Sequence, residues 1–141
     1  MPSNDEYLKS SKIAVFGVSP KRRTFASGVK DKLENAGFEI FLIHPDAPEG
    51  WYADLDYLPE KLDSVYIATS RKNASIIVDN VIKSGARKIW LQYGAFNNDI
   101  IEKCKSAGLE TYTGCLMMYI PNSGFPHSFH RFLFELFKGK Q

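Results

Sequence analysis

The chain has 141 residues, of which 44% are hydrophobic, and a formal net charge of +2; this is the size and composition of one domain with its own core. The small net charge disfavours nucleic acid as a partner, and two distant cysteines without a CxxC spacing disfavour a disulfide scaffold or a zinc site. The sequence has no signal-peptide pattern and no apolar run of the roughly 18 residues that a bilayer requires. We therefore expect a cytoplasmic protein without a membrane partner.

Strands and helices are predicted to alternate along the chain. Short runs rich in β-branched and aromatic residues predict five strands, at 12–16, 38–43, 64–69, 88–92 and 109–113. Apolar residues at helical spacing predict helices over 25–36, 74–82 and 100–107, each followed by or ending near a glycine that can close it: Gly37, Gly85 and Gly108. Nearly continuous apolar strands that alternate with helices indicate a parallel sheet covered on both faces. We predict an α/β fold, a doubly wound five-stranded parallel sheet in three α/β/α layers.

Two segments fit this alternation less well. Pro48, Gly50 and Pro59 interrupt the connection over 45–63, which predicts a short helical turn or an irregular cover on the sheet. After the fifth strand, a broad apolar stripe predicts a terminal helix over about 127–138. That stripe fits either packing within one molecule or a two-fold homodimer interface. No linker interrupts the chain, so residues 1–141 are predicted to form one domain with a core over about 10–115.

The loop after the first strand is the strongest candidate for a ligand site. An apolar strand breaks at Gly17, passes through a short polar loop and leads into a predicted helix, which presents backbone N–H groups and a positive helix end to an anion. Lys21, Arg22 and Arg23 add three successive cations. The loop is therefore predicted to bind more negative charge than one phosphate carries. These residues also have structural explanations that involve no ligand. Gly17 fits a tight turn, and Ser19 and Thr24 fit caps of the first helix.

The pattern of this loop narrows the class of nucleotide. A dinucleotide fingerprint needs glycines where Ser19 and Arg22 stand, and an NAD site needs an acidic residue at the end of the second strand, where His44 and Pro45 stand. NAD is therefore disfavoured. Coenzyme A and NADP, which carry a further phosphate on the ribose, remain as candidates.

Other loops at the carboxyl ends of the strands supply further candidates, because ligands of open α/β sheets bind there. Thr69, Ser70 and Arg71 follow the third strand, and Gln92 and Gly94 follow the fourth. Alternatively, Arg71 pairs with a surface carboxylate and Gln92 fastens a loop backbone.

The sequence assigns no catalytic residue and no metal. It contains no Ser-His-Asp order, paired-carboxylate motif or Walker loop, and His127 and His130 lack a third ligand. Cys115, at the predicted ligand edge, is either a reactive thiol or a buried structural cysteine. Whether the protein is an enzyme stays open, and a binding protein is favoured.

The motifs IAVFGVSP (13–20), IHP (43–45) and WLQYG (90–94) followed by Asn97 resemble those of the small stand-alone CoA-binding-domain proteins. These proteins resemble the nucleotide-binding domain of the succinyl-CoA synthetase alpha subunit. The resemblance covers about residues 12–115, in order and spacing. Two features depart from the family pattern: His44 stands where members more often carry Asn, and the tail after Cys115 differs.

The resemblance implies a Rossmann-like fold that holds coenzyme A, or an acyl-CoA, with loop 17–22 at the phosphates. It does not imply a CoA ligase, because the phosphorylated histidine of the synthetase lies in another domain. The alternatives are an NADP-linked or other nucleotide-using enzyme, and an interaction subunit that acts through its terminal helix. The predicted cofactor-binding residues are Gly17, Val18, Ser19, Pro20, Lys21, Arg22, Thr24, His44, Pro45, Thr69, Ser70, Arg71, Gln92 and Gly94.

Overall fold

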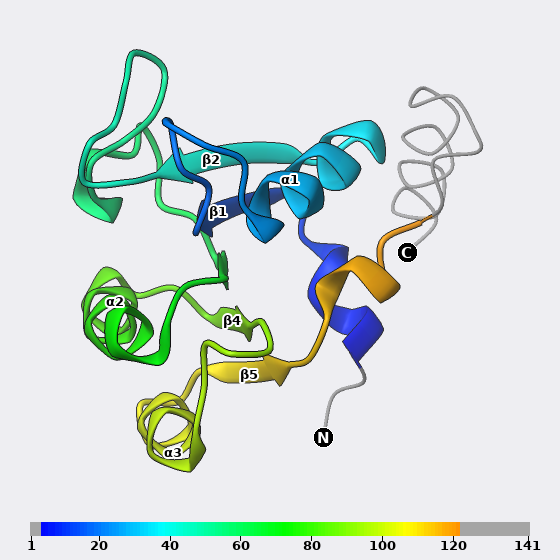
Figure 1. Ribbon diagram of the computed structural model, residues 1–141. Helices are drawn as coiled ribbons and strands as arrows, with labels where there is room; N and C mark the ends of the chain where they lie inside the picture. Colours follow the sequence, from blue (N-terminus) through cyan, green and yellow to red (C-terminus); the bar gives the residue numbers. More distant parts are fainter. Residues whose placement is uncertain (1–3, 122–141) are drawn as a thin grey trace.

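A computed structural model describes residues 4–121 (Figure 1). Its five parallel strands form one sheet in the order β2-β1-β3-β4-β5. The strands are β1 (Lys12–Phe16), β2 (Glu39–Ile43), β3 (Ser64–Ile67), β4 (Lys88–Leu91) and β5 (Glu110–Thr113). The predicted fold class is confirmed, and each predicted strand is present with ends within two residues. The predicted terminal helix over 127–138, with its dimer contact, lies outside the described residues.

Three helices connect the strands: α1 (Phe25–Asn35), α2 (Arg71–Ser84) and α3 (Asn98–Ser106). Polar side chains cap the N-termini of α2 and α3. The Ser70 hydroxyl accepts a hydrogen bond from the Asn73 N–H at 3.3 Å, and the Asn97 side chain accepts one from the Ile100 N–H at 2.9 Å. Gly85, which caps the end of α2, has a φ of +80°, a conformation that costs glycine little. Local sequence therefore sets where these helices begin and end.

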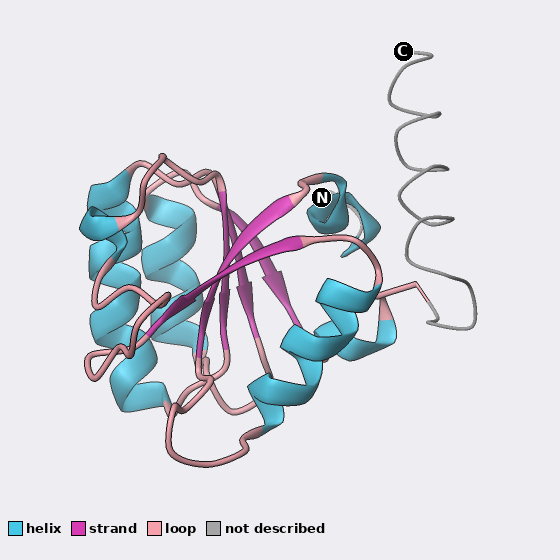
Figure 2. Cartoon of the chain, turned by 90° about the horizontal axis from the view of Figure 1, so that it is seen from above, coloured by secondary structure: helices cyan, strands magenta, loops and turns pink. Residues whose placement is uncertain are grey.

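The sheet lies between two layers of helix (Figure 2). α2 and α3 cover one face, together with a 3-10 turn, η2 (Leu55–Tyr57), in the irregular 45–63 connection. α1 covers part of the other face, together with two 3-10 segments, η1 (Asn4–Lys9) and η3 (Leu116–Met118). Each face has its own apolar core, and the short η2 turn matches the prediction for 45–63.

The N-terminal segment η1 was not predicted from the sequence, although it completes one face of the sheet. Tyr7 of η1 is fully buried, with its ring centroid 5.4 Å from those of Trp90 and Tyr112 in edge-on contacts. Trp90 and Tyr112 stack on each other at 5.8 Å. Burial raises the pKa of Tyr7 well above its usual value, so the phenol stays neutral there. This aromatic cluster fills the space beside α1 above β4 and β5.

We expect Tyr7→Phe to raise the free energy of unfolding by about 1 kcal/mol, because the buried Tyr7 hydroxyl has no hydrogen-bond partner in the described part of the chain. Tyr66→Phe is the matched control. It removes the bond that the buried Tyr66 hydroxyl donates to Gln92 Oε1 at 2.8 Å, so it should lower the free energy of unfolding by about 1 kcal/mol. Urea denaturation of both variants measures the difference. Equal destabilisation by the two substitutions would contradict this account of Tyr7.

Candidate functional site

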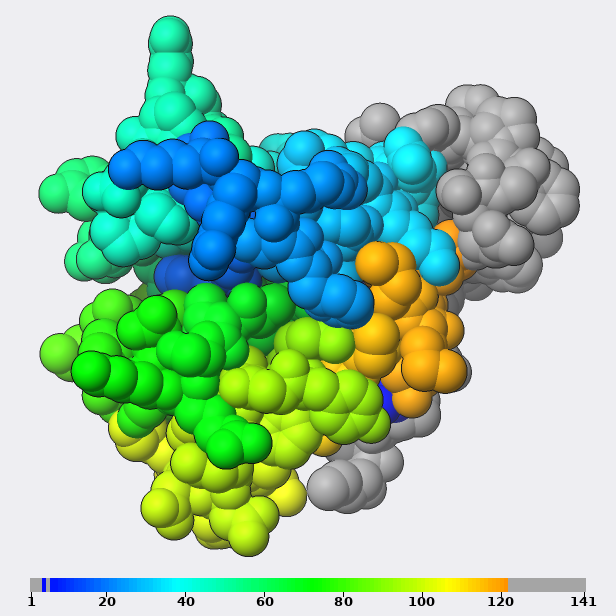
Figure 3. Space-filling view, viewed as in Figure 1, coloured from blue at the N-terminus to red at the C-terminus, as the bar shows by residue number. Residues whose placement is uncertain are grey.

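A cavity opens where the order of the strands reverses. From β1 the chain crosses to β2 on one side, and β3 pairs with β1 on the other, so the loops after β1 and β3 diverge at the carboxyl edge of the sheet. The cavity measures about 860 Å³, a volume typical of small-molecule sites. Figure 3 shows the hollow between the blue loop after β1 and the green surface of α2. Its walls come from the loops after β1, β2 and β3, from η2 and from α2.

Gly17 allows the ends of β1 and β3 to come together beneath the cavity. Its φ is +121°, and a Cβ at this position would lie 2.4 Å from the carbonyl oxygen of Ala68. The Gly17 carbonyl accepts a hydrogen bond from Thr24 Oγ1 at 2.7 Å, which fastens the far end of the loop to its start. Gly17 therefore has the tight-turn role that the sequence allowed, with close packing against Ala68, and it also lines the cavity.

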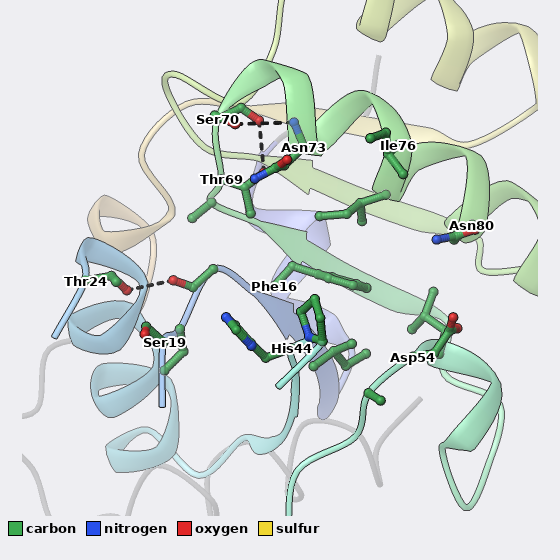
Figure 4. Close-up of a pocket in the computed structure, with 18 of the residues that line it drawn as sticks. Phe16, Ser19, Thr24, His44, Asp54, Thr69, Ser70, Asn73, Ile76 and Asn80 are labelled. Carbon is green, nitrogen blue, oxygen red and sulfur yellow. Dashed lines mark hydrogen bonds between the residues drawn. The ribbon is translucent and has the colours of Figure 1, made fainter. Parts of the chain in front are cut away.

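Two helix N-termini border the same cavity. α1 begins after Thr24 and α2 begins after Ser70, and both residues belong to the lining (Figure 4). The loop between β1 and α1 is held by its own side chains, since Ser19 Oγ accepts from the Lys21 N–H at 3.2 Å and the Thr24 N–H donates to Ser27 Oγ at 2.9 Å. The positive ends of two helices favour an anion at this end of the cavity.

Of the three successive cations in the loop, Arg22 lines the cavity. All three residues are exposed, but Lys21 and Arg23 lie outside the lining. Arg23 forms an ion pair with Asp31 at 2.7 Å on the outer side of α1. The hydrogen bond from Arg23, and secondarily the nearby Lys30, lower the pKa of Asp31. The loop therefore places Arg22 at the cavity and pairs the guanidinium of Arg23 with a surface carboxylate.

His44 lines the cavity and has one ring nitrogen already occupied. Its Nδ1 accepts the N–H of Asp46 at 3.0 Å, so that nitrogen carries no proton and Nε2 does. The neutral imidazole with Nε2–H can donate to a ligand oxygen. His44 and Pro45 both line the cavity, and Figure 4 shows His44 on the same side as Ser19, across from Ser70 and Asn73.

The structure gathers most of the predicted site residues and separates five from the cavity. Those in the lining are Gly17, Val18, Ser19, Arg22, Thr24, His44, Pro45, Thr69 and Ser70. Those outside it are Pro20, Lys21, Arg71, Gln92 and Gly94.

Two of the residues outside the lining hold loops in place. Arg71 Nε donates to the Phe96 carbonyl at 3.2 Å rather than to a carboxylate. Gln92 is buried, and its Oε1 accepts from the Tyr66 hydroxyl at 2.8 Å and from the Leu116 N–H at 3.2 Å. Gln92 thus fastens β3 and η3 to the end of β4, which is the alternative role that the sequence allowed.

Several lining residues were missed. Asn73, Ile76, Ile77 and Asn80 recur at the spacing of one helix face, a signal that could have placed them together on α2. Asp54 reaches the cavity at the start of η2, inside a segment without periodicity. The sequence argument found no acidic residue at the end of the second strand, yet the structure brings one to the same cavity from farther along the chain.

The two cysteines lie outside the lining of the cavity. Cys104 is buried on α3, and burial raises the pKa of its thiol to about 11. Cys115 is half-buried at the start of η3 and is not part of the lining.

Within residues 4–121, no group of His, Cys, Asp or Glu gathers that could hold a metal ion. None of the described helices has the length and apolar content needed to cross a membrane.

Solved structures share the whole fold. A hypothetical protein from Pyrococcus horikoshii OT3 is 28% identical with a TM-score of 0.73, over 83% of this chain and 89% of that one. Cell-free ID.343 from Thermus thermophilus is 23% identical with a TM-score of 0.70, over 83% and 96%.

A larger protein contains the same fold as one part. The dinucleotide-forming acetyl-coenzyme A synthetase 1 from Ca. Korarchaeum cryptofilum, in complex with phosphate and ADP, is 22% identical with a TM-score of 0.64, over 75% of this chain but 26% of that one. The family model described as "CoA binding domain" matches residues 11–121. The chain therefore belongs to the CoA binding domain family, as its motifs suggested.

Proposed function

We propose that this protein binds coenzyme A, or an acyl-CoA, in the cavity between the ends of β1 and β3, with the phosphates against residues 17–22. One observation carries the proposal: two helix N-termini and Arg22 border a single cavity at the switch point of the sheet, in a member of the CoA binding domain family. Helix ends and a guanidinium both favour phosphate oxygens.

The polar groups around the anionic end suit several phosphates at once. Arg22 supplies a full charge, while the hydroxyls of Ser19 and Ser70 and the Nε2–H of His44 supply shorter-range contacts. In this proposal, the exposed Lys21 beside the loop attracts the remaining phosphate. Such a set fits the pyrophosphate and ribose 3′-phosphate of coenzyme A.

The protein is proposed to carry or sense the ligand rather than to transform it. In the lining as described, the ionisable side chains are Arg22, His44 and Asp54. Arg22 and Asp54 serve charge recognition, and no thiol or amine of the described lining stands where it could attack a thioester. Binding without chemistry is therefore the role that this lining supports best.

We expect coenzyme A to bind about tenfold more tightly than 3′-dephospho-CoA, since the missing phosphate removes one charge-assisted contact. Isothermal titration calorimetry on the whole protein measures both affinities, and competition with NADP and NAD ranks the alternatives. NAD, which lacks a third phosphate, should compete least. If NAD binds as tightly as coenzyme A in this competition, or if coenzyme A does not bind at all, the proposal is wrong.

A further inference from the structure

An apolar patch surrounds η3, on the face of the sheet that α1 covers only in part. Large hydrophobic side chains stay exposed at six positions of the described residues, and four of these belong to the patch: Phe25, Tyr93, Met118 and Tyr119. Met118 is the most exposed of them, at 82%. Exposed apolar residues are ordinary one at a time, whereas a contiguous group marks a surface that another group covers. We call these four residues and Met117 the η3 patch.

The contacts of Met117 join η3 to α1. A Cβ added at Gly28 would lie 3.5 Å from Met117 Cε, and Lys32 Nζ donates to the Met117 carbonyl at 3.2 Å. Phe25, Gly28 and Lys32 are spaced three and four residues apart, so they lie along one face of α1. Phe25 therefore lies one turn from the Met117 contact, on the same side of the helix.

Tyr93 and Tyr119 complete the patch around η3. The Tyr93 hydroxyl lies 3.8 Å from where a Cβ on Gly114 would stand, at the loop that leads into η3. The Tyr119 ring lies 5.3 Å from that of Trp90 between centroids, and its hydroxyl accepts from Asn4 Nδ2 at 3.1 Å. Figure 3 shows the orange surface of η3 between the blue start of α1 and the yellow-green loop after β4. Three segments that are distant in sequence therefore form one apolar surface.

The part of the chain that the structure does not describe begins at this surface. Pro121 is the last described residue, two positions beyond the η3 patch. The 20 residues that follow hold five of the ten phenylalanines of the chain. Phe129, Leu133 and Leu136 recur there at helical spacing, and Phe134 falls on the opposite side of that pattern. Such a stripe needs an apolar surface on which to be buried.

The short connection favours the patch of the same molecule over that of a second copy. Seven residues separate Pro121 from Phe129, and a connection of this length can span about 25 Å. Asn122, Ser123 and Gly124 are residue types that favour a change of chain direction. A segment on so short a connection meets its own patch at an effective concentration of about millimolar, far above that of a second molecule in dilute solution.

We infer that residues 125–137 pack their apolar stripe on the η3 patch of the same molecule, against Phe25 and Met118. Of the two roles that the sequence left open for this stripe, the inference selects packing within one molecule. It goes beyond the proposed function, because none of the five residues of the η3 patch lines the cavity. Ligand affinity and coverage of the patch can therefore fail independently.

Hydrogen–deuterium exchange of the whole protein, read on peptides from residues 125–137, tests the inference. In wild type these amides should exchange at least about tenfold more slowly than those of a free peptide of the same sequence. Met118→Glu puts a charge into the patch, so exchange of 125–137 should become at least about tenfold faster than in wild type. Leu133→Glu charges the stripe instead and should have the same effect. Slow exchange of the strand amides verifies that each variant is folded.

Two matched controls carry the same charge away from the contact. Tyr57 is 70% exposed on η2, at the opposite face of the sheet, so Tyr57→Glu should leave exchange of 125–137 unchanged. Phe134→Glu, on the other side of the stripe, should also leave it unchanged.

Three outcomes would overturn the inference. The first is exchange of 125–137 in wild type as fast as in the free peptide, and the second is protection that neither Met118→Glu nor Leu133→Glu reduces. The third is protection that appears only as the protein concentration rises, with a dimer in sedimentation velocity, because a second copy would then cover the patch.

Discussion

Gly17→Ala is expected to lower the free energy of unfolding by about 2–5 kcal/mol, the largest stability effect that we predict for a single methyl group. The new Cβ would meet the backbone oxygen of Ala68 at 2.4 Å, and the φ of +121° is strained for any residue with a side chain. Because Ala68 follows β3, relief requires the ends of β1 and β3 to separate. Coenzyme A affinity should fall as well, since both residues line the cavity. Chemical denaturation and calorimetry measure the two effects.

Gly50→Ala is the control that separates two causes of the destabilisation by Gly17→Ala, the steric clash of the new Cβ and the strain of a positive φ. Gly50 also has a positive φ, +89°, but a Cβ added there would have no neighbouring atom of the described residues within 4 Å. Its substitution should cost about 1 kcal/mol and leave ligand affinity unchanged. If Gly17→Ala is no more destabilising than Gly50→Ala, the close approach of β1 and β3 is not what requires glycine at position 17.

Arg22→Ala is expected to weaken coenzyme A binding by about 1.5–3 kcal/mol, the usual value of a hydrogen bond to a charged group. Arg22 is the cation of the loop that lines the cavity, so its removal eliminates a charge-assisted contact with phosphate. Wild-type affinity should also fall more steeply with added salt than the affinity of the variant. Calorimetry at two ionic strengths measures both quantities.

The neighbouring Arg23 provides the control for Arg22. Arg23→Ala removes an equal charge one residue away, but Arg23 lies outside the lining and pairs with Asp31. Its effect on coenzyme A affinity should be within about 0.5 kcal/mol, as is typical of surface charges. Equal losses in the two variants would mean that the loop acts through its net charge rather than through one positioned guanidinium.

The fold could be predicted because each strand and helix is encoded locally. Residues 12–16 form an apolar β-branched run that fits a buried parallel strand, and Gly85 ends α2 where the helical pattern stops. From alternating strands and helices, the carboxyl edge of the sheet followed as the place for a ligand. The loop after β1 and the His44-Pro45 and Thr69-Ser70 turns were found in this way.

The parts that could not be predicted depend on contacts between distant segments. Tyr7 lies in a short 3-10 segment whose position is set by Trp90 and Tyr112, not by any pattern of its own. Asp54 lies in an aperiodic connection, and its place at the cavity depends on how that connection folds back on α2. Gln92 stands in the expected loop, but its side chain turns inward to Tyr66. Sequence position alone does not determine such orientations.

One helix carries residues of both ends of the cavity. Ser70 precedes α2 at the anionic end, and Asn80 lies on its third turn at the far end. A helix rotates about 100° per residue, so inserting or deleting one residue between these positions would turn everything beyond it away from the ligand. Substitutions in α2 can therefore change which groups the cavity recognises, whereas changes in its length cannot be tolerated without losing one end. The 45–63 connection offers little more freedom, because the backbone of Tyr52 within it is hydrogen-bonded to Leu42 and His44 at the edge of the sheet.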